Sequence, residues 1–344
     1  MTKILIVKTS SLGDVVHMLP AIYDWVYANK TSLSQSNQAL QIDWVVEEAF
    51  QEVPNWSPYI HRVIPIAVRR WRKSLFSFKT WQEIRQFKHD LRAVQYDYVI
   101  DSQGLLKSAL VASWANTVNS SLWGYNKNSI REPLASRFYT HKIQVSRQQH
   151  AIQRNRLLMA KVFNYRLDNK PLNYGIIEQA KTLSKASNSA NNATLDLKNK
   201  SYIVALHGTS KVEKEWPISA WLELLKQVQK DDFNVVFPWG NADEKQRVEY
   251  LISQANNAIM LPRCCLSELL SIILHAKAVI GMDTGLMHIA AALNKQGLAL
   301  YPVTEVKLTG VLTGSDYNRI ENIAGAACED IDAVIYKMRQ LLAK

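Results

Sequence analysis

The sequence predicts an α/β protein built from two doubly wound domains, each a parallel sheet covered by helices. Short apolar runs alternate with longer segments of helical periodicity in both halves of the chain, which is typical of βαβ units. A polar, low-complexity stretch over residues 184–194 separates the halves and has little to bury. The 344 residues are enough for two domains, each with its own core.

The first strand and the turn after it organise the chain. The apolar run Ile4–Val7 predicts a buried parallel strand, and the small residues Thr9–Gly13 predict a turn whose backbone approaches a ligand. Ser11, followed three residues later by Asp14, fits the N-cap and the third position of a helix. We therefore expect Asp14 at the carboxyl edge of the sheet, where it is a candidate general base. The alternative is that this carboxylate only complements the helix dipole.

The glycine pattern of this turn excludes two common nucleotide sites. It matches neither the GxGxxG fingerprint of dinucleotide-binding domains nor the GxxxxGK[ST] pattern of a P-loop. The pattern therefore argues against nicotinamide chemistry and against ATP hydrolysis.

A dense cationic cluster follows the third predicted strand. Strands are expected over Gln41–Glu48 and Val63–Ile66, and the second of them leads into four cations around one tryptophan: Arg69, Arg70, Arg72 and Lys73. Guanidinium groups match carboxylates and phosphates, so this cationic cluster is a candidate site for an acidic ligand. A solvated helix face is the alternative.

The rest of the first half repeats the strand, turn and helix arrangement. A helix is predicted over Ser77–Val94, with a stripe expected to face the core that consists of Trp81, Ile84, Phe87 and Leu91. A strand over Tyr96–Asp101 then leads through a polar turn into a helix that carries Lys107. Lys107 and the loop residue Arg131 are candidate anion ligands, with ordinary exposed side chains as the alternative.

The second half predicts another parallel sheet. Its strands are expected over Tyr202–His207, Asn234–Phe237, Ala258–Leu261 and Ala278–Met282. The helices between and after them are expected over Ile218–Gln229, Glu244–Gln254, Leu266–His275 and Thr284–Leu293.

Small polar and charged residues follow the strands of this second sheet. Thr209, Ser210 and Lys214 offer two hydroxyl donors and one point charge, which suits a diphosphate. Glu244 is a candidate for ribose hydroxyls, although such an acid also favours a helix N-terminus. The strongest signal is Asp283-Thr284-Gly285, which opens a helix and offers backbone N–H groups to an anion. His288 lies one turn later and is either a ligand or a satisfied helix residue.

Composition limits the partners and the compartment. The net charge of +11 indicates an anionic partner: nucleic acid, a membrane surface or a phosphorylated substrate. Cys264, Cys265 and Cys328 form no metal-ligand spacing and no even-numbered disulfide framework, which favours a reducing compartment. We find no signal-peptide pattern and no apolar stretch of the roughly 18–20 residues that span a bilayer, so a cytoplasmic protein is expected.

Together these motifs resemble those of the lipopolysaccharide heptosyltransferases, a family of inverting glycosyltransferases with the GT-B fold. They run in order from residue 3 to about residue 302. The matching segments are Lys8–Val15, Asp43–Glu48, Arg69–Lys73, Gln103–Ser108, Arg131–Ser136, Pro238–Gly240 and Asp283–Leu286. Within the family, the chain most resembles the members that add the first heptose of the inner core.

The resemblance implies a specific reaction. An L-glycero-D-manno-heptose would pass from ADP-heptose to the 5-hydroxyl of Kdo on Kdo-lipid A, with inversion at the anomeric carbon. No obligatory metal and no cofactor besides the donor substrate are implied. The resemblance also implies two Rossmann-like domains facing each other across a cleft, and a peripheral place on the cytoplasmic face of the inner membrane of a Gram-negative cell.

The resemblance further implies roles for individual residues. Asp14 would deprotonate the acceptor hydroxyl. The donor would be held by Thr209, Ser210, Lys214, Glu244, Asp283, Thr284, Gly285 and His288. The acceptor would be held by Ser11, Gly13, Arg69, Arg70, Arg72, Lys73, Lys107 and Arg131.

The expected domain organisation follows the family. Residues 1–170 would form the acceptor domain and residues 171–327 the ADP-sugar domain, with a final helix in 328–344 packing back on the first domain. The segment Tyr301–Glu305 departs from the Gly-Pro-Thr that is common in the family, which leaves the local contacts to diphosphate or adenine open. Asp330 and Asp332 are interpreted as capping residues of the last helix, not as metal ligands.

Three other functions are compatible with parts of the sequence. Heptosyltransferase II, or another GT-B transferase for a different core acceptor, keeps the chemistry and changes the substrate. A nucleic-acid-binding protein would need aromatics interleaved with cations along one surface, and most of the tryptophans lie instead in apolar periodic segments. A non-catalytic binding module would tolerate Asp14→Asn without loss of function.

Overall fold

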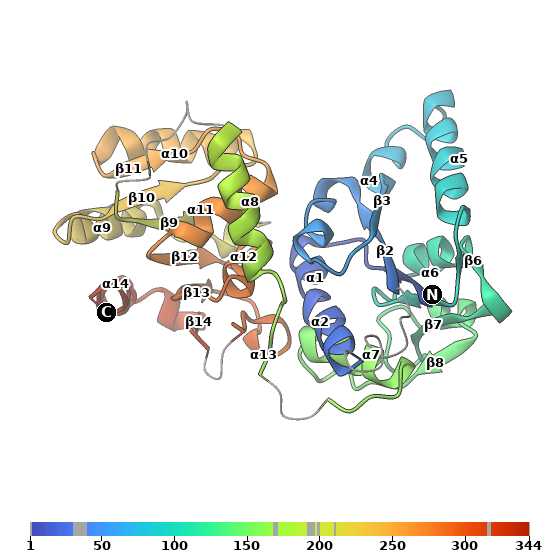
Figure 1. The fold of residues 1–344 in the computed structure, drawn as a ribbon. Coiled ribbons are helices and arrows are strands. Elements are labelled where there is room, and N and C mark those ends of the chain that lie inside the picture. The colour runs from blue at the N-terminus through green and yellow to red at the C-terminus, as the bar shows by residue number, and fades with distance from the viewer. Residues whose placement is uncertain are drawn as a thin grey trace. The chain divides into compact units, whose positions relative to one another are not determined.

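The computed structural model describes residues 2–29, 40–167, 171–190, 197, 200–209, 211–314 and 318–343. The chain forms two compact units, Met1–Lys170 and Pro171–Lys344 (Figure 1). Each unit contains one six-stranded sheet.

The sheet of the first unit has the strand order β3-β2-β1-β5-β7-β8. All five of its strand pairs are parallel. When only the six strands of this sheet are numbered along the chain, the order is the 3-2-1-4-5-6 order of a Rossmann fold. Its switch point lies between β1 and β5. The strands are β1 (Thr2–Val7), β2 (Leu40–Glu47), β3 (Arg62–Ile66), β5 (Tyr98–Asp101), β7 (Leu122–Tyr125) and β8 (His141–Ile143).

Helices and short turns connect these strands. The helices are α1 (Leu12–Val16), α2 (Leu19–Ala28), α4 (Val68–Trp71), α5 (Phe78–Arg92), α6 (Leu106–Ser113) and α7 (Ala151–Val162). The 3₁₀ turns are η1 (Glu48–Phe50), η2 (Pro54–Trp56), η3 (Val118–Ser120) and η4 (Pro133–Phe138). A separate parallel pair consists of β4 (Gln95–Tyr96) and β6 (Asn116–Thr117).

The central strand is as apolar and as buried as the sequence predicts. Ile4, Leu5, Ile6 and Val7 are all inaccessible to solvent, because β1 has neighbours on both edges and helices over its faces. The predicted strand over Tyr96–Asp101 divides into β4 and β5, because only Tyr98–Asp101 pairs with β1.

One predicted core stripe is only partly buried. Phe87 and Leu91 of α5 are buried, but Trp81 is 59% exposed. The prediction that Trp81 faces the core is therefore wrong. The buried residue of the first turn of α5 is Thr80, while the Trp81 Nε1–H donates to the Leu75 carbonyl oxygen at 2.9 Å.

The sheet of the second unit repeats the same order, β11-β10-β9-β12-β13-β14. Its five strand pairs are also parallel. The switch point lies between β9 and β12. The strands are β9 (Tyr202–Leu206), β10 (Asn234–Phe237), β11 (Ala258–Met260), β12 (Ala278–Met282), β13 (Gly297–Tyr301) and β14 (Ile320–Ala324).

The helices of this unit are α8 (Ile177–Ala190), α9 (Ile218–Gln229), α10 (Ala242–Gln254), α11 (Leu266–His275), α12 (Gly285–Ala292), α13 (Val306–Thr309) and α14 (Ile331–Leu342). Helices α9, α10, α11 and α12 agree closely with the predicted ranges, whereas α8 and α13 were not predicted. Two 3₁₀ turns, η5 (Val212–Lys214) and η6 (Gly325–Cys328), complete the unit.

Helix α8 includes the first part of the polar, low-complexity stretch that was expected to separate the halves and to bury little. Its small side chains Ala180 and Ser184 are buried, and the Ser184 and Ser271 hydroxyls share a hydrogen bond of 2.7 Å. Small residues allow α8 to pack closely on α11, so a segment that is poor in large apolar residues still forms a helix. The end of the low-complexity stretch, residues 191–194, lies outside the described residues.

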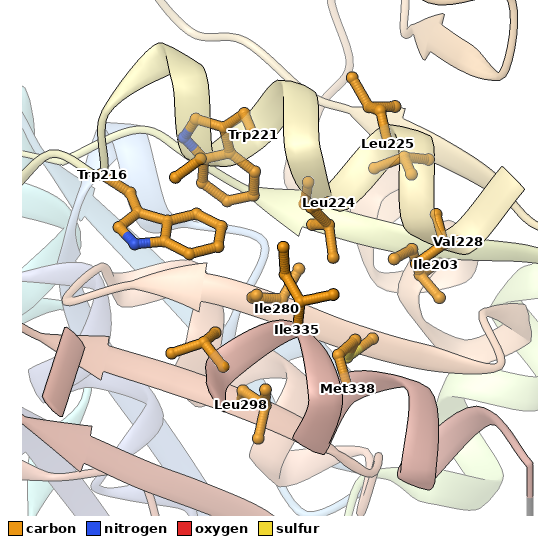
Figure 2. Close-up of a cluster of buried hydrophobic side chains, with 14 of the residues drawn as sticks. Ile203, Trp216, Trp221, Leu224, Leu225, Val228, Ile280, Leu298, Ile335 and Met338 are labelled. Carbon is orange, nitrogen blue, oxygen red and sulfur yellow. The ribbon is translucent and has the colours of Figure 1, made fainter. Parts of the chain in front are cut away.

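The main core of the second unit lies between α9, α14 and one face of the sheet (Figure 2). Trp216 and Trp221 meet edge to face with ring centroids 5.0 Å apart. Leu224 of α9 lies among them and, like Ile203 and Ile280 of the strands, has no exposed surface. Alternate residues of each strand contribute to this face, as the period of two requires.

The final helix packs on this same core. Its apolar residues Val334, Ile335, Met338 and Leu342 belong to the buried cluster of the second unit. Arg339 also pairs with Asp231 at 2.6 Å. The sheet of the second unit therefore buries the apolar stripe of the final helix.

Leu224→Ala tests this core. We expect the free energy of unfolding of the second unit to fall by about 2–5 kcal/mol, because the change leaves a cavity in a fully buried site. Urea unfolding followed by circular dichroism measures the loss. Lys226→Ala on the same helix removes only an exposed ion pair with Glu223 and should change stability by less than about 0.5 kcal/mol. Equal effects of the two variants would contradict the assignment of the core.

Candidate active site

Asp14 lies at the switch point of the first sheet. It is the third residue of α1, whose N-cap is Ser11, as the sequence predicts. Its Oδ2 accepts the Ser11 backbone N–H at 2.8 Å and lies 3.3 Å from the Ser11 hydroxyl. The side chain is half-buried. Asp14 thus caps its helix and also lies at the carboxyl edge of the sheet, so the two sequence interpretations are compatible.

The turn that precedes Asp14 is held by Gln103. The Gln103 Oε1 accepts the backbone N–H groups of Thr9 and Ser10, both at 3.2 Å. Lys107 reaches the same turn, with its Nζ 3.3 Å from the Ser10 hydroxyl. The sequence analysis did not select Gln103 as a site residue, although it lies in the polar turn after β5 that was singled out.

A buried carboxylate fixes the position of Gln103. Asp101 accepts the backbone N–H of Gln103 at 2.9 Å, the Ser108 hydroxyl at 2.8 Å and the Tyr139 hydroxyl at 2.7 Å. Burial raises the pKa of Asp101, and these hydrogen bonds oppose that rise. Burial and the Asp101 carboxylate both raise the pKa of Tyr139, so its hydroxyl stays a donor. Gly104 completes the turn with φ +70°, a conformation that favours glycine.

A buried lysine lies in the same region. The Lys8 Nζ donates to the Ser102 carbonyl oxygen at 2.9 Å. Desolvation lowers the pKa of Lys8, and the carboxylates of Asp14 and Asp101 act in the opposite direction. The electrostatic environment of Asp14 therefore includes a buried ammonium group that the sequence analysis did not identify.

The cationic cluster is tied to the same sheet edge through Glu47. The Glu47 N–H donates to the Thr9 carbonyl oxygen at 3.1 Å, and its Oε1 accepts the Arg69 backbone N–H at 2.9 Å. Arg70 is occupied by ion pairs with Glu48 at 3.0 Å and Glu83 at 2.7 Å. Within the cationic cluster, Arg70 therefore stabilises the local structure through its ion pairs.

The other predicted acceptor cations are open to solvent. Arg72 and Lys73 are exposed and form no ion pair within the described residues. Arg131 is also exposed, and its neighbour Glu132 accepts the Leu106 N–H at 2.7 Å. That contact holds the Arg131 loop against the start of α6. Gly13, another predicted acceptor contact, is buried inside α1.

In the second unit, three side chains contact Asp283 at the switch point of the sheet. Its Oδ2 lies 2.6 Å from the Lys214 Nζ and accepts the Thr304 hydroxyl at 2.7 Å. The Thr209 hydroxyl lies 3.5 Å from the Asp283 carbonyl oxygen. Ser210 lies outside the described residues. Thr304 belongs to the segment that departs from the family pattern and was not predicted as a site residue. Its hydroxyl group, which can donate a hydrogen bond to a carboxylate, is the feature that could have indicated this contact with Asp283.

Glu244 lies at the same edge, beside the ends of β9 and β10. Its carboxylate accepts the Gly240 N–H at 2.7 Å and the Asn241 side-chain amide at 2.9 Å. A Cβ on Gly208 would lie 2.6 Å from the Glu244 Oε1, so the close approach depends on glycine. These contacts are typical of the start of a helix, and they hold the carboxylate at the carboxyl edge of the sheet.

The other predicted donor residues lie in α12. Thr284 is the N-cap and Gly285 the first residue of this helix. His288 is buried one turn further in, with 6% of its surface exposed. Asp330 accepts the Ala333 N–H at 3.0 Å, which confirms its capping role in α14. Among the described residues, no cluster of three or more His, Cys, Asp or Glu side chains could hold a metal ion.

Two Rossmann-type sheets in one chain, each with charged and hydroxyl side chains at its switch point, are the architecture of the GT-B fold. The chain belongs to glycosyltransferase family 9 (heptosyltransferase), whose family model matches residues 84–334. Lipopolysaccharide heptosyltransferase 1 of Pseudomonas aeruginosa is 40% identical over 92% of this chain and 84% of its own length. The same enzyme of Escherichia coli K12 is 37% identical over 90% of both chains.

Solved structures agree with this assignment. The E. coli heptosyltransferase WaaC with ADP superposes with a TM-score of 0.84 at 35% identity, covering 99% of this chain and all of that one. WaaC with ADP-2-deoxy-2-fluoro heptose gives a TM-score of 0.82 at 33% identity over 99% of both chains. The protein is therefore a heptosyltransferase of the GT-B fold. In the described part of the chain, no helix is both long and apolar enough to span a bilayer.

Tyr139→Phe tests the Asp101 network. The change removes one of the hydrogen bonds to a buried carboxylate and should lower the free energy of unfolding of the first unit by about 1–3 kcal/mol. Thermal or urea unfolding gives the value. Tyr59→Phe removes a hydroxyl from a half-buried ring in the same unit and should be close to neutral. A Tyr139→Phe variant as stable as the wild type would show that the network does not support the turn.

Proposed function

We propose that the protein transfers L-glycero-D-manno-heptose from ADP-heptose to the 5-hydroxyl of Kdo on Kdo-lipid A, with inversion. The observation that carries the proposal is the position of Asp14 at the switch point of the first sheet, in a turn held by Gln103. The relatives named heptosyltransferase 1, and WaaC solved with ADP and with an ADP-heptose analogue, support the sugar and the donor.

Asp14 would act as the general base. Its carboxylate would take the proton of the acceptor hydroxyl as that oxygen attacks the anomeric carbon. The bond from the anomeric carbon to the diphosphate oxygen breaks on the opposite face, and ADP leaves. One displacement from the opposite face inverts the anomeric centre.

The second unit would bind the donor. Lys214, Thr209 and the backbone at the start of α12 are arranged for a diphosphate, with Asp283 holding the ammonium in place. Ser210 would add a hydroxyl to the same group. Glu244 would accept hydrogen bonds from ribose hydroxyls. Asp283 and Thr304 would position the heptose, and His288, one turn into α12, would complete the donor site.

The first unit would bind the acceptor. Ser11 and Gly13 would contact it next to Asp14, and Lys107 at the turn would take one acidic group. The other cations suited to carboxylates and phosphates are Arg69, Arg72, Lys73 and Arg131. Arg70 would act through its ion pairs with Glu48 and Glu83 by holding α4 in place. A lipid-linked acceptor implies a peripheral position on an anionic membrane surface, on the cytoplasmic side of the inner membrane.

Asp14→Asn tests the assignment of the base. The amide keeps an oxygen for the Ser11 N–H but cannot accept a proton, so kcat should fall by about 10²–10⁴-fold while ADP affinity is unchanged. Transfer from ADP-heptose to Kdo-lipid A and calorimetry with ADP measure the two quantities. Asp332→Asn, an exposed acid in the first turn of α14, is the matched control and should keep full activity. If the wild type transferred heptose only to an acceptor that already carries a heptose, Kdo would not be the acceptor.

Lys214→Ala tests the donor site. Loss of a charge-assisted contact worth about 1.5–3 kcal/mol should weaken ADP binding by about 10–100-fold. Lys211→Ala removes a nearby exposed lysine that pairs with Glu213 and should change ADP affinity by less than about twofold. Isothermal titration with ADP compares the two variants. Similar affinities for both would mean that Lys214 does not contact the diphosphate.

A further inference from the structure

The connection from α4 to α5 and the first turn of α5 together expose four large apolar side chains within seven residues. Leu75 is 51% exposed, Phe76 103%, Phe78 85% and Trp81 59%. We call these four residues the apolar tip. Contiguous exposed apolar surface of this kind marks an interaction site on a soluble domain, because it costs free energy in water and contributes nothing to the core.

The apolar tip is held in a defined shape. The Trp81 indole N–H donates to the Leu75 carbonyl oxygen at 2.9 Å, and the Ser77 N–H donates to the Ser74 carbonyl oxygen at 3.0 Å. The Ser74 and Thr80 hydroxyls share a hydrogen bond of 3.0 Å. These contacts close the connection on itself, so the phenyl rings project outward from an ordered turn.

A second set of contacts anchors the tip to the first unit. The Trp71 indole N–H donates to Glu83 Oε2 at 2.7 Å, and its ring meets the Phe87 ring edge to face with centroids 6.0 Å apart. Arg70 joins Glu83 to Glu48, which directly follows β2. The segment is therefore rigidly attached to the carboxyl edge of the sheet.

The charge around the apolar tip is strongly positive. Residues 69–88 contain seven Lys or Arg residues and one acid, Glu83, which is already paired with Arg70. Arg72, Lys73 and Lys79, which lie closest in sequence to the tip, are exposed. Aromatic side chains flanked by lysines and arginines match the interface of an anionic bilayer, where rings enter the headgroup region and cations meet phosphates.

We infer that the apolar tip inserts into the interface of an anionic lipid bilayer, with Arg72, Lys73 and Lys79 on the headgroups. The inference rests on the proposed function for its purpose, because β3 and β1 end at the same sheet edge and the tip follows β3. A bilayer bound there would present a lipid-linked acceptor on the Asp14 side of the first unit. Two binding elements are needed, since neither charge nor a few rings alone gives stable attachment.

Vesicle flotation with the full chain tests the inference. The probes are vesicles of equimolar phosphatidylcholine and phosphatidylglycerol, with phosphatidylcholine vesicles for comparison. The double variant Phe76→Ser/Phe78→Ser should bind the anionic vesicles about tenfold or more weakly than the wild type, because two rings no longer enter the interface. Binding by the wild type should weaken with added salt and should be weaker on phosphatidylcholine.

A matched variant and a fluorescence measurement complete the test. Tyr250→Ser/Ile252→Ser removes two exposed apolar residues from α10 in the second unit and should bind vesicles like the wild type. Brominated lipids should quench part of the wild-type tryptophan fluorescence, and Trp81→Phe should lose that part. Because the rings of Phe76 and Phe78 are almost fully exposed, the double variant should retain its circular dichroism spectrum and its urea midpoint.

Three results would overturn the inference. One is equal vesicle affinity of wild type and Phe76→Ser/Phe78→Ser. Another is vesicle binding that ignores salt and headgroup charge. The last is a wild type that forms dimers in sedimentation experiments where the double variant is monomeric, which would assign the apolar tip to a second copy of the chain.

A soluble, deacylated acceptor separates this inference from the proposed function. The double variant should transfer heptose to that acceptor at the wild-type rate and lose activity only on acceptor embedded in vesicles. Wild-type transfer to the soluble acceptor without vesicle binding would reject the inference alone. Tip-dependent vesicle binding without heptose transfer to either acceptor would reject the proposed function and leave the inference standing.

Discussion

The hydrogen bonds from Gln103 to the turn after β1 are the interaction on which the first unit's site depends. A turn of small residues at the end of a buried strand has backbone N–H groups that need partners, and the Gln103 Oε1 accepts two of them. Asp101 fixes Gln103 in turn, and Tyr139 and Ser108 satisfy Asp101. The position of Asp14 therefore depends on a chain of contacts that joins β1, β5 and the segment after η4.

The switch point of the second sheet carries a different set of side chains from that of the first. Both sheets have the 3-2-1-4-5-6 order, so in each the connections reverse direction beside the first strand and leave an open edge. In the first unit that edge carries a half-buried carboxylate on a short helix. In the second it carries an Asp283–Lys214 pair with Thr304 as a further donor. One architecture thus presents a candidate base in one unit and a candidate diphosphate site in the other.

The cationic segment after β3 combines two tasks that the sequence alone does not separate. Arg70 is used to hold α4 against Glu48 and Glu83, while Arg72 and Lys73 remain exposed. The same ion pairs also stiffen the base of the apolar tip. Structural support and ligand contact therefore come from neighbouring residues of one charge run, which is why the run cannot be assigned to a single role.

The sequence by itself determined the α/β class of both halves, because buried parallel strands and amphipathic helices leave periodic apolar patterns, and its motifs indicated the family. The order of the strands in each sheet came from the structure. The sequence also placed Asp14 at the third position of its helix, since the capping pattern is local. Only the tertiary structure decided which partners meet across the sheet: Gln103 with Thr9, Thr304 with Asp283, and α14 with the second sheet. It also decided that Trp81 is exposed and that α8 is a helix. Those outcomes depend on contacts between residues far apart in the chain, or on which side of a helix has a neighbour, and local periodicity does not contain that information.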